Sequence, residues 1–316
     1  MDIDSLIDGI KKGDRAAVSR GISLVETTSV NSSVRRIISS IYRNTGGAHI
    51  IGITGPPGIG KSTIIGRLSG MLHDSGVSVS VIAIDASSPF SGGSFLGNRI
   101  RMQESLSSRG IFMRSVANRG ISGGLSRSVW DAVKILDAAG FQIIIVETVG
   151  AGQADLEVRD LVDTVAVVLG PGLGDEIQAV KAGIMEIGDL FLINKMDREG
   201  SFLAMKDIQE TLAMSPGKGW KIPVLGLNSL NGDGYSELLK SLDMRKEYVQ
   251  RNSEIRLKRQ MMELKTIVQN AMISKINSRF EDSSLMENII NRIREGEKDP
   301  YSAADSIINS IFKSSE

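Results

Sequence analysis

Residues 55–63 have the types and spacing needed to hold a phosphate. They read Gly-Pro-Pro-Gly-Ile-Gly-Lys-Ser-Thr and fit the pattern G-x-x-x-x-G-K-S/T, between a predicted strand and a predicted helix. Glycines let consecutive N–H groups turn inward around a phosphate, and the helix adds partial positive charge at its N-terminus. We expect Lys61 to reach the β- and γ-phosphates of a nucleotide and the Ser62 hydroxyl to bind Mg²⁺ as a hard oxygen ligand. The alternative, a glycine-rich turn without a ligand, is disfavoured by this strand–loop–helix context. The predicted phosphate-binding residues are Gly55, Pro56, Pro57, Gly58, Ile59, Gly60, Lys61, Ser62 and Thr63.

Two carboxylates at the ends of predicted strands are candidates for a metal site. Glu147 opens the run Glu-Thr-Val-Gly, which resembles the D-x-x-G element of GTPases with Glu in place of Asp. There the carboxylate would hold Mg²⁺ through water, and the N–H of Gly150 would bond the γ-phosphate. Asp85 would lie in the outer shell of Mg²⁺ or orient the attacking water, and the alternative is a cap of its loop. The predicted metal-site residues are Ser62, Asp85 and Glu147, and the predicted catalytic residues are Lys61, Asp85 and Glu147.

A second motif, residues 194–197, predicts which base the nucleotide carries. These residues read Asn-Lys-Met-Asp and fit N-K-x-D. An ionised Asp197 can accept two hydrogen bonds at once from the N1–H and 2-amino groups of guanine, a pair that adenine lacks. Lys195 would lie along the base, and the loop after the last predicted strand would offer N–H groups to guanine O6. The alternative for the motif is a helix cap. The predicted base-binding residues are Asn194, Lys195, Asp197, Ser229, Leu230 and Asn231.

The elements that position these residues are short apolar runs alternating with helical stretches. Runs that are apolar almost throughout predict strands buried on both faces, and hence a mostly parallel sheet covered by helices. We therefore predict an α/β fold of the P-loop NTPase type. The predicted strands are His49–Thr54, Val77–Asp85, Ile111–Val116, Phe141–Thr148, Thr164–Leu169, Leu190–Asn194 and Ile222–Leu227.

Helical patterns flank the predicted sheet on both sides and suggest three domains. We predict an N-terminal helical bundle over residues 1–45, a nucleotide-binding domain over 46–241 and a C-terminal helical arm over 242–316. In the arm, apolar residues from Leu257 to Met272 recur at helical spacing, which predicts either a dimer seam or a helix packed on its own domain. A further helix is expected over about 283–294. Residues 299–305 are then expected to form a helix entry, in which Pro300 supplies a stop.

Composition excludes several classes of site. Lys plus Arg and Asp plus Glu both number 37, so the formal net charge is zero and no basic field for nucleic acid exists over the whole chain. With no Cys and two His, disulfides, Fe–S clusters and thiolate zinc sites are excluded. No apolar run approaches the roughly 20 residues that span a bilayer, and the first residues do not read as a signal peptide. We expect a soluble, cytoplasmic protein.

Taken together, these segments resemble the MeaB/ArgK family of P-loop GTPases in the SIMIBI class, which includes the human methylmalonic aciduria type A protein. The resembling segments are GPPGIGKST (55–63), AIDASSPFSGGSFLGNRIRM (83–102), ANRGISGGL (117–125), IVETVGAGQAD (145–155), VLGPGLGDEIQAVKAGIMEIGD (168–189) and NKMD (194–197). The resemblance implies GTP hydrolysis that gates cofactor loading and protection of an adenosylcobalamin-dependent acyl-CoA mutase of the methylmalonyl-CoA mutase type. It also implies a homodimer formed by the C-terminal arm, and a mobile switch near Gln178–Lys181.

Two positions depart from the pattern of this family, and two other functions remain open. The family usually has Asp at Asn98, so Mg²⁺ would be held more weakly here or by water, and it usually has Ala at Leu230. Arginines near the glycine-rich segments, Arg127 among them, are candidates for phosphate contacts. The alternative functions are a P-loop kinase acting in amino-acid (lysine/arginine/ornithine) transport and an ATP-driven assembly switch, against which N-K-x-D argues.

Overall fold

The computed structural model describes residues 2–27, 32–86, 94–118, 125–148, 154–172, 183, 185–214, 219–281 and 283–313. Gly150 and the predicted switch at 178–181 lie outside the described residues. The backbones of Asp85 and Asn98 are described, but their side chains are not. Among the described helices, none is both long enough and apolar enough to cross a membrane.

The centre of the fold is one seven-stranded sheet in which every neighbouring pair of strands is parallel, in the order β3-β2-β4-β1-β5-β6-β7. This confirms the predicted α/β fold with a parallel sheet. All seven predicted strands are present, and each end lies within two residues of its predicted position. The strands are β1 (His49–Thr54), β2 (Val79–Ala86), β3 (Phe112–Asn118), β4 (Ile143–Glu147), β5 (Thr164–Leu169), β6 (Leu190–Ile193) and β7 (Val224–Gly226).

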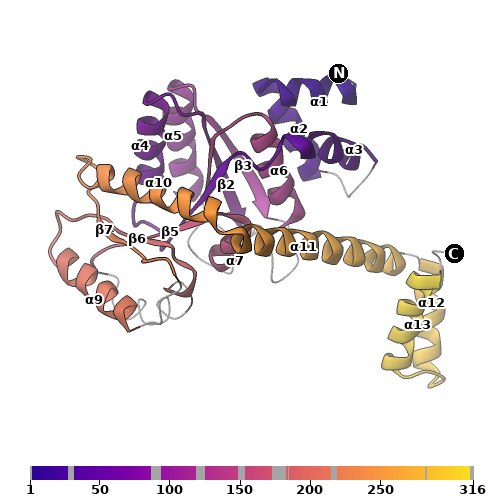
Figure 1. Cartoon of the computed structure of the whole chain (residues 1–316). Helices are drawn as coiled ribbons and strands as arrows, with labels where there is room; N and C mark the ends of the chain where they lie inside the picture. The colour runs from indigo at the N-terminus through magenta and orange to yellow at the C-terminus, as the bar shows by residue number, and fades with distance from the viewer. Residues whose placement is uncertain are drawn as a thin grey trace. The chain divides into compact units, whose positions relative to one another are not determined.

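Helices cover both faces of the sheet, which explains why its strands are apolar along their whole length. Every residue of β1, β4, β5 and β6 is buried. One apolar core lies between the sheet and helices α4, α5 and α10, and the other includes α6, α7 and the N-terminal helices (Figure 1). The helices concerned are α1 (Ile3–Lys11), α2 (Arg15–Thr27), α3 (Ser32–Ile41), α4 (Lys61–Asp74), α5 (Ser94–Ser108), α6 (Arg127–Ala138), α7 (Ala154–Leu161) and α10 (Tyr235–Arg251).

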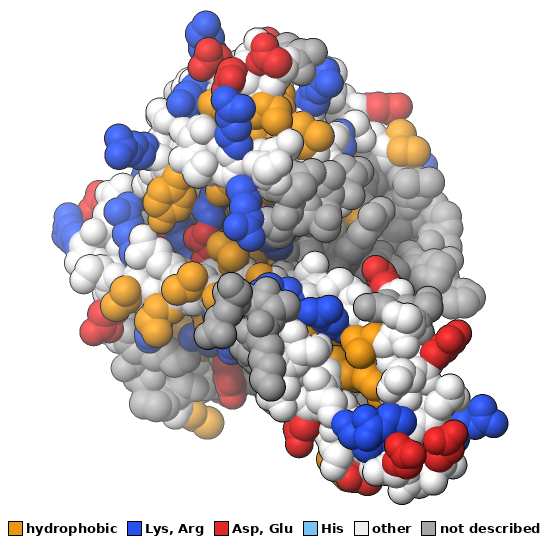
Figure 2. Space-filling view, turned by 90° about the vertical axis from the view of Figure 1, so that its right-hand side faces the viewer, with side chains coloured by type: hydrophobic (Ala, Val, Ile, Leu, Met, Phe, Trp, Pro, Cys, Tyr) orange, Lys and Arg blue, Asp and Glu red, His pale blue; other side chains and the backbone are white. Residues whose placement is uncertain are grey.

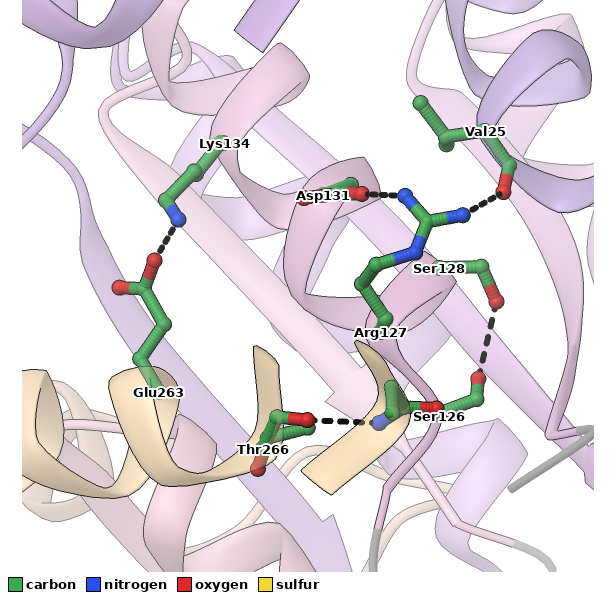
Figure 3. Close-up of polar contacts among 9 residues, drawn as sticks. Val25, Ser126, Arg127, Ser128, Asp131, Lys134, Glu263 and Thr266 are labelled. Atoms are coloured by element: carbon green, nitrogen blue, oxygen red, sulfur yellow. Dashed lines mark hydrogen bonds and ion pairs between the residues drawn. The ribbon is translucent and has the colours of Figure 1, made fainter. Parts of the chain in front are cut away.

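Helix α6 carries charged residues into the protein interior, because each has a partner there. Arg127 forms an ion pair with Asp131 one turn later and donates to the Val25 carbonyl of α2, and Lys134 pairs with Glu263 (Figure 3). Burial raises the pKa of Asp131 and lowers that of Lys134, and the opposite charges nearby counteract both shifts. Arg127, a candidate for phosphate contact, thus ties α6 to the N-terminal helices.

The C-terminal part is helical, and the chain divides into compact units at residues 1–263 and 264–316. Asn252 separates α10 from α11 (Ser253–Phe280), and α12 (Ser283–Arg294) has the predicted bounds. The predicted helix entry at residues 299–305 is confirmed by α13 (Pro300–Lys313), but Pro300 begins this helix and does not stop one. Asp299 accepts hydrogen bonds from the N–H groups of Tyr301 and Ser302. The division into three domains at residues 45 and 241 stays a prediction.

The surface agrees with the balance of charges in the sequence. On the face drawn in Figure 2, Lys and Arg side chains of the described residues are interspersed with Asp and Glu side chains. This mixing fits the formal net charge of zero.

His49 joins β1 to β5 at the start of both strands, and its burial makes stability depend on pH. Its Nε2 lies 3.0 Å from the Thr164 hydroxyl oxygen. Burial lowers the pKa of His49 from 6.5 to about 4, and the negative charge of Asp163 opposes that shift in part.

We expect the free energy of unfolding to fall as the pH drops from about 6.5 towards about 4. In this window the unfolded chain binds a proton on His49 that the folded chain excludes, so acid favours unfolding, by up to about 3 kcal/mol. Urea denaturation of the wild type and His49→Gln at about pH 7 and about pH 4.5 checks this. The variant should lose less of its unfolding free energy on acidification, and equal losses would contradict the prediction.

Candidate nucleotide-binding site

The phosphate loop lies at the carboxyl edge of the sheet, between the end of β1 and the start of α4. The connection from β1 runs toward β2 on one side, and the connection from its neighbour β5 runs toward β6 on the other. The loop therefore lies at the reversal of strand order, the usual place for a ligand in open parallel sheets. Lys61 is the first residue of α4, and its Nζ donates to the carbonyl oxygens of Gly55 at 2.7 Å and Pro56 at 3.0 Å. The buried ammonium therefore lies within the curve of the predicted phosphate loop.

Ser62 and Glu147 meet beside this loop. The Ser62 hydroxyl donates to Glu147 Oε1 at 2.8 Å, although the two residues are 85 positions apart. Glu147 ends β4 opposite Ile53 of β1, and this pairing carries the carboxylate to the loop that follows β1. A hydroxyl and a buried carboxylate side by side are hard oxygen donors of the kind Mg²⁺ prefers. The structure thus brings together two of the three predicted metal-site residues.

Asp85, the third predicted metal-site residue, lies further along the neighbouring strand. In β2, Ala83 pairs with Glu147 of β4, and Asp85 follows two residues later, opposite Ala117 of β3. Its backbone is thus at the same edge of the sheet as Glu147. The predicted role of its side chain stays a prediction.

Asn194 connects the phosphate loop to the loop after β7. Its fully buried amide donates to the Ile59 carbonyl at 2.8 Å and to the Ser229 hydroxyl at 3.2 Å, while its Oδ1 accepts from the Ser229 N–H at 3.1 Å. Gly60 makes room for it, because a Cβ at this left-handed position would lie 2.4 Å from Asn194 Nδ2. Asn194, the first residue of N-K-x-D, therefore contacts both the predicted phosphate loop and the predicted base-binding loop.

Lys195 has a strained backbone and also contacts the phosphate loop. Among the described residues it is the one non-glycine with positive φ, 64°. Its Nζ donates to the Gly58 carbonyl at 3.0 Å, which lays the side chain between the two loops. Such strain persists only where the surroundings hold it, and it is concentrated at functional sites. Asp197, two residues later, is exposed at the same edge.

The loop of residues 228–231 presents two N–H groups to a single oxygen atom. The N–H groups of Leu230 and Asn231 both point to Asn228 Oδ1, at 3.0 and 3.4 Å. Adjacent N–H groups that converge in this way form a receptor for an oxygen with partial negative charge. Leu230 is 80% exposed, so the larger side chain at this departure from the expected family pattern lies in solvent.

Two residues shape this loop, Asn228 and Arg67. The sequence indicated Asn228 only as the first residue of the loop, without a role for its side chain, and it did not indicate Arg67. Asn228 directly precedes a predicted base-binding residue, so its position was a usable signal. Arg67 of α4 donates to the carbonyls of Leu230 and Asn231, both at 2.8 Å. No spacing rule links residues that are more than 160 positions apart.

Comparison with known proteins identifies the family. The sequence profile of the methylmalonyl-CoA mutase-associated GTPase MeaB matches residues 18–281. The chain belongs to the MeaB family. It is a GTPase and binds guanine nucleotides.

Relatives of the chain cover nearly its whole length. A Pyrococcus horikoshii protein named as a GTPase is 43% identical over 316 residues, which are 98% of each chain. The mitochondrial methylmalonic aciduria type A homolog of Mus musculus is 31% identical, over 99% of this chain and 80% of its own. A crystal structure of an LAO/AO transport system kinase superposes with a TM-score of 0.70 and 23% identity, over 98% of this chain and 97% of that one, and this likeness shows the fold alone.

Proposed function

We propose that GTP binds along the carboxyl edge of the sheet, with its phosphates in the loop of residues 55–63 and its base beside Asp197. The observation that carries this proposal is the set of hydrogen bonds from Asn194 and Lys195 to the phosphate loop, which joins the two halves of the predicted site. Asp197 would accept from the N1–H and 2-amino groups of guanine. The converging N–H groups of Leu230 and Asn231 would bind guanine O6 in place of Asn228 Oδ1, which they contact in this structure.

Hydrolysis at this site would rest on positioning and on neutralising phosphate charge. The Lys61 ammonium lies inside the loop where it can reach the β- and γ-phosphates. Ser62 and Glu147 fit Mg²⁺, because their oxygens are hard donors that already lie side by side. We assign them, with Asp85, to hold it. When bound, Mg²⁺ would neutralise negative charge developing on the phosphates.

We further propose that GTP hydrolysis gates cofactor loading and protection of an adenosylcobalamin-dependent acyl-CoA mutase. The family description names methylmalonyl-CoA mutase, and the mouse relative is named for methylmalonic aciduria. The absence of Cys and the presence of two His favour an organic cofactor on a partner as cargo over a bare metal ion. The alternative of an amino-acid transport kinase has only a likeness of fold behind it.

A test of this proposal is nucleotide-dependent association with a methylmalonyl-CoA mutase. We expect the mutase to be retained by the immobilised full-length protein to different extents with a non-hydrolysable GTP analogue and with GDP. The corresponding ATP analogue is the control, because it carries the same phosphates on a base that Asp197 does not recognise. Retention that is absent, or the same with every nucleotide, would contradict the chaperone role.

We also propose a homodimer. The exposed apolar residues of α11 recur at helical spacing and offer a surface that a second copy of the chain would cover. They are Leu257, Met261, Leu264 and Val268.

A further inference from the structure

Arg67 holds the loop of residues 229–231 by its backbone carbonyls. Its guanidinium donates to the carbonyl oxygens of Leu230 and Asn231, each at 2.8 Å, and approaches that of Ser229 at 3.5 Å. Arg67 lies in the helix that begins with Lys61, so one helix carries both the phosphate-loop lysine and this contact. A rigid guanidinium fork fixes the directions of the carbonyls it binds more closely than a single ammonium does.

The surroundings of Arg67 form a socket that fits the guanidinium. Gly232 has a φ of +97°, and a Cβ there would lie 2.2 Å from Arg67 Nη2, so a larger residue would displace the group. On another side, the centre of the fully buried Tyr235 ring lies 5.6 Å from Arg67 Cζ, within range of a cation–π interaction. The glycine, the aromatic ring and the carbonyls thus restrict Arg67 to one position.

Holding these carbonyls also sets the direction of the N–H groups that follow them. A peptide unit is planar and trans, so its C=O and N–H point in opposite directions. The Leu230 carbonyl shares a plane with the Asn231 N–H, and the Ser229 carbonyl shares one with the Leu230 N–H. Arg67 therefore binds carbonyls on one side of the loop, and the N–H groups of the same peptide units converge on Asn228 Oδ1 on the other side.

We propose that Arg67 is a positioning residue for base selection, which aims the Leu230 and Asn231 N–H groups at the place where the keto oxygen of guanine would replace Asn228 Oδ1. This inference rests on the proposed placement of the base. Arg67 itself does not touch the nucleotide in this arrangement. Without the guanidinium, the two peptide planes keep only the hydrogen bonds to Asn228 Oδ1, which O6 would replace, and O6 then loses donors that were oriented before the nucleotide arrived.

The test compares the affinities of the full-length wild type and Arg67→Ala for GDP, 6-thio-GDP and IDP. 6-Thio-GDP keeps both groups that face Asp197 but replaces O6 by the weaker acceptor sulfur, while IDP keeps O6 and lacks the 2-amino group. We expect the wild type to prefer GDP over 6-thio-GDP by about tenfold, and Arg67→Ala to reduce this ratio to about one. The ratio of GDP to IDP affinity should not change.

Two further variants keep this test decisive. Arg67→Lys retains the positive charge and most of the side-chain volume, and it should also lower the GDP to 6-thio-GDP ratio because one ammonium cannot replace the fork. If Arg67→Ala does not fold, Arg67→Lys alone is sufficient for the test. Arg251→Ala is the matched control, since it removes an exposed arginine that pairs with Glu247, and it should leave both ratios at their wild-type values.

The outcomes separate this inference from the placement of the base. Equal weakening of all three nucleotides by the Arg67 variants would make Arg67 a general support of the fold, and a fall in both ratios would mean that the whole site is disturbed. Either result overturns the inference. A wild type that does not distinguish GDP from IDP would instead overturn the placement of guanine beside Asp197.

Discussion

Asp197→Asn is expected to change the base that the protein selects from guanine to xanthine. The carboxylate accepts from the N1–H and 2-amino groups of guanine, whereas an amide can accept one of these bonds and donate another. Xanthine has a carbonyl in place of the 2-amino group and so matches the amide. With guanine, the variant loses one charge-assisted hydrogen bond, and its amide NH₂ faces another donor. We therefore expect GDP binding to weaken by at least about 100-fold.

Titration of both proteins with fluorescent GDP and XDP measures this change. We expect the wild type to bind GDP far more tightly than XDP, and the variant to reverse that order. Because Asp197 is exposed, the substitution should leave the thermal midpoint of unfolding close to that of the wild type. If the order of the GDP and XDP affinities is the same in both proteins, Asp197 does not select the base. An adenine nucleotide serves as the control that neither protein should bind well.

Lys61→Ala is expected to slow GTP hydrolysis by roughly 1,000-fold. The ammonium lies inside the phosphate loop and is placed to neutralise charge on the β- and γ-phosphates as the bond between them breaks. No other Lys or Arg of the described loop residues 55–63 can replace it. Phosphate release in single-turnover reactions measures the rate of the chemical step directly.

The matched control for Lys61→Ala is Lys195→Ala, which removes the second lysine in contact with the phosphate loop. Lys195 bonds the Gly58 carbonyl and lies beside the proposed base, so its loss should weaken nucleotide binding more than it slows hydrolysis of bound GTP. The relative affinities of Lys61→Ala for GDP and ADP should stay as in the wild type. A hydrolysis rate within a factor of about three of the wild type would remove Lys61 from the catalytic role.

The parts of the fold that follow from local pattern could be predicted from the sequence. Strands buried on both faces read as apolar runs, and so His49–Thr54 and Thr164–Leu169 were predicted with the bounds that the structure has. The phosphate-binding motif could also be recognised, because its loop and the first turn of the helix that follows are adjacent in sequence. The entry to α13 was also predicted, at residues 299–305, and only the role of Pro300 was wrong, because at the first turn of a helix its missing N–H costs no hydrogen bond.

Contacts between distant segments could not be predicted in this way. The Ser62–Glu147 hydrogen bond could be predicted if β1 and β4 were known to be neighbours. The residues of the two strands do not show which strands lie side by side in the sheet. Arg67 belongs to no motif, and its role depends on Gly232 and Tyr235 lying opposite it. One sequence shows which residues can do chemistry, and the three-dimensional arrangement shows which residues hold them.

The position of β1 in the sheet has a consequence for how the chain folds during synthesis. Both neighbours of β1 come later in sequence: Ile51 pairs with Ile145 on one side and with Thr164 on the other. A parallel pair cannot form through a tight hairpin, so β1 has no partner until a long segment beyond it has been made. The strand that ends in the phosphate loop is then an apolar segment with two open edges. The loop therefore takes its final position only after the ribosome has delivered the chain through β5, about 100 residues later.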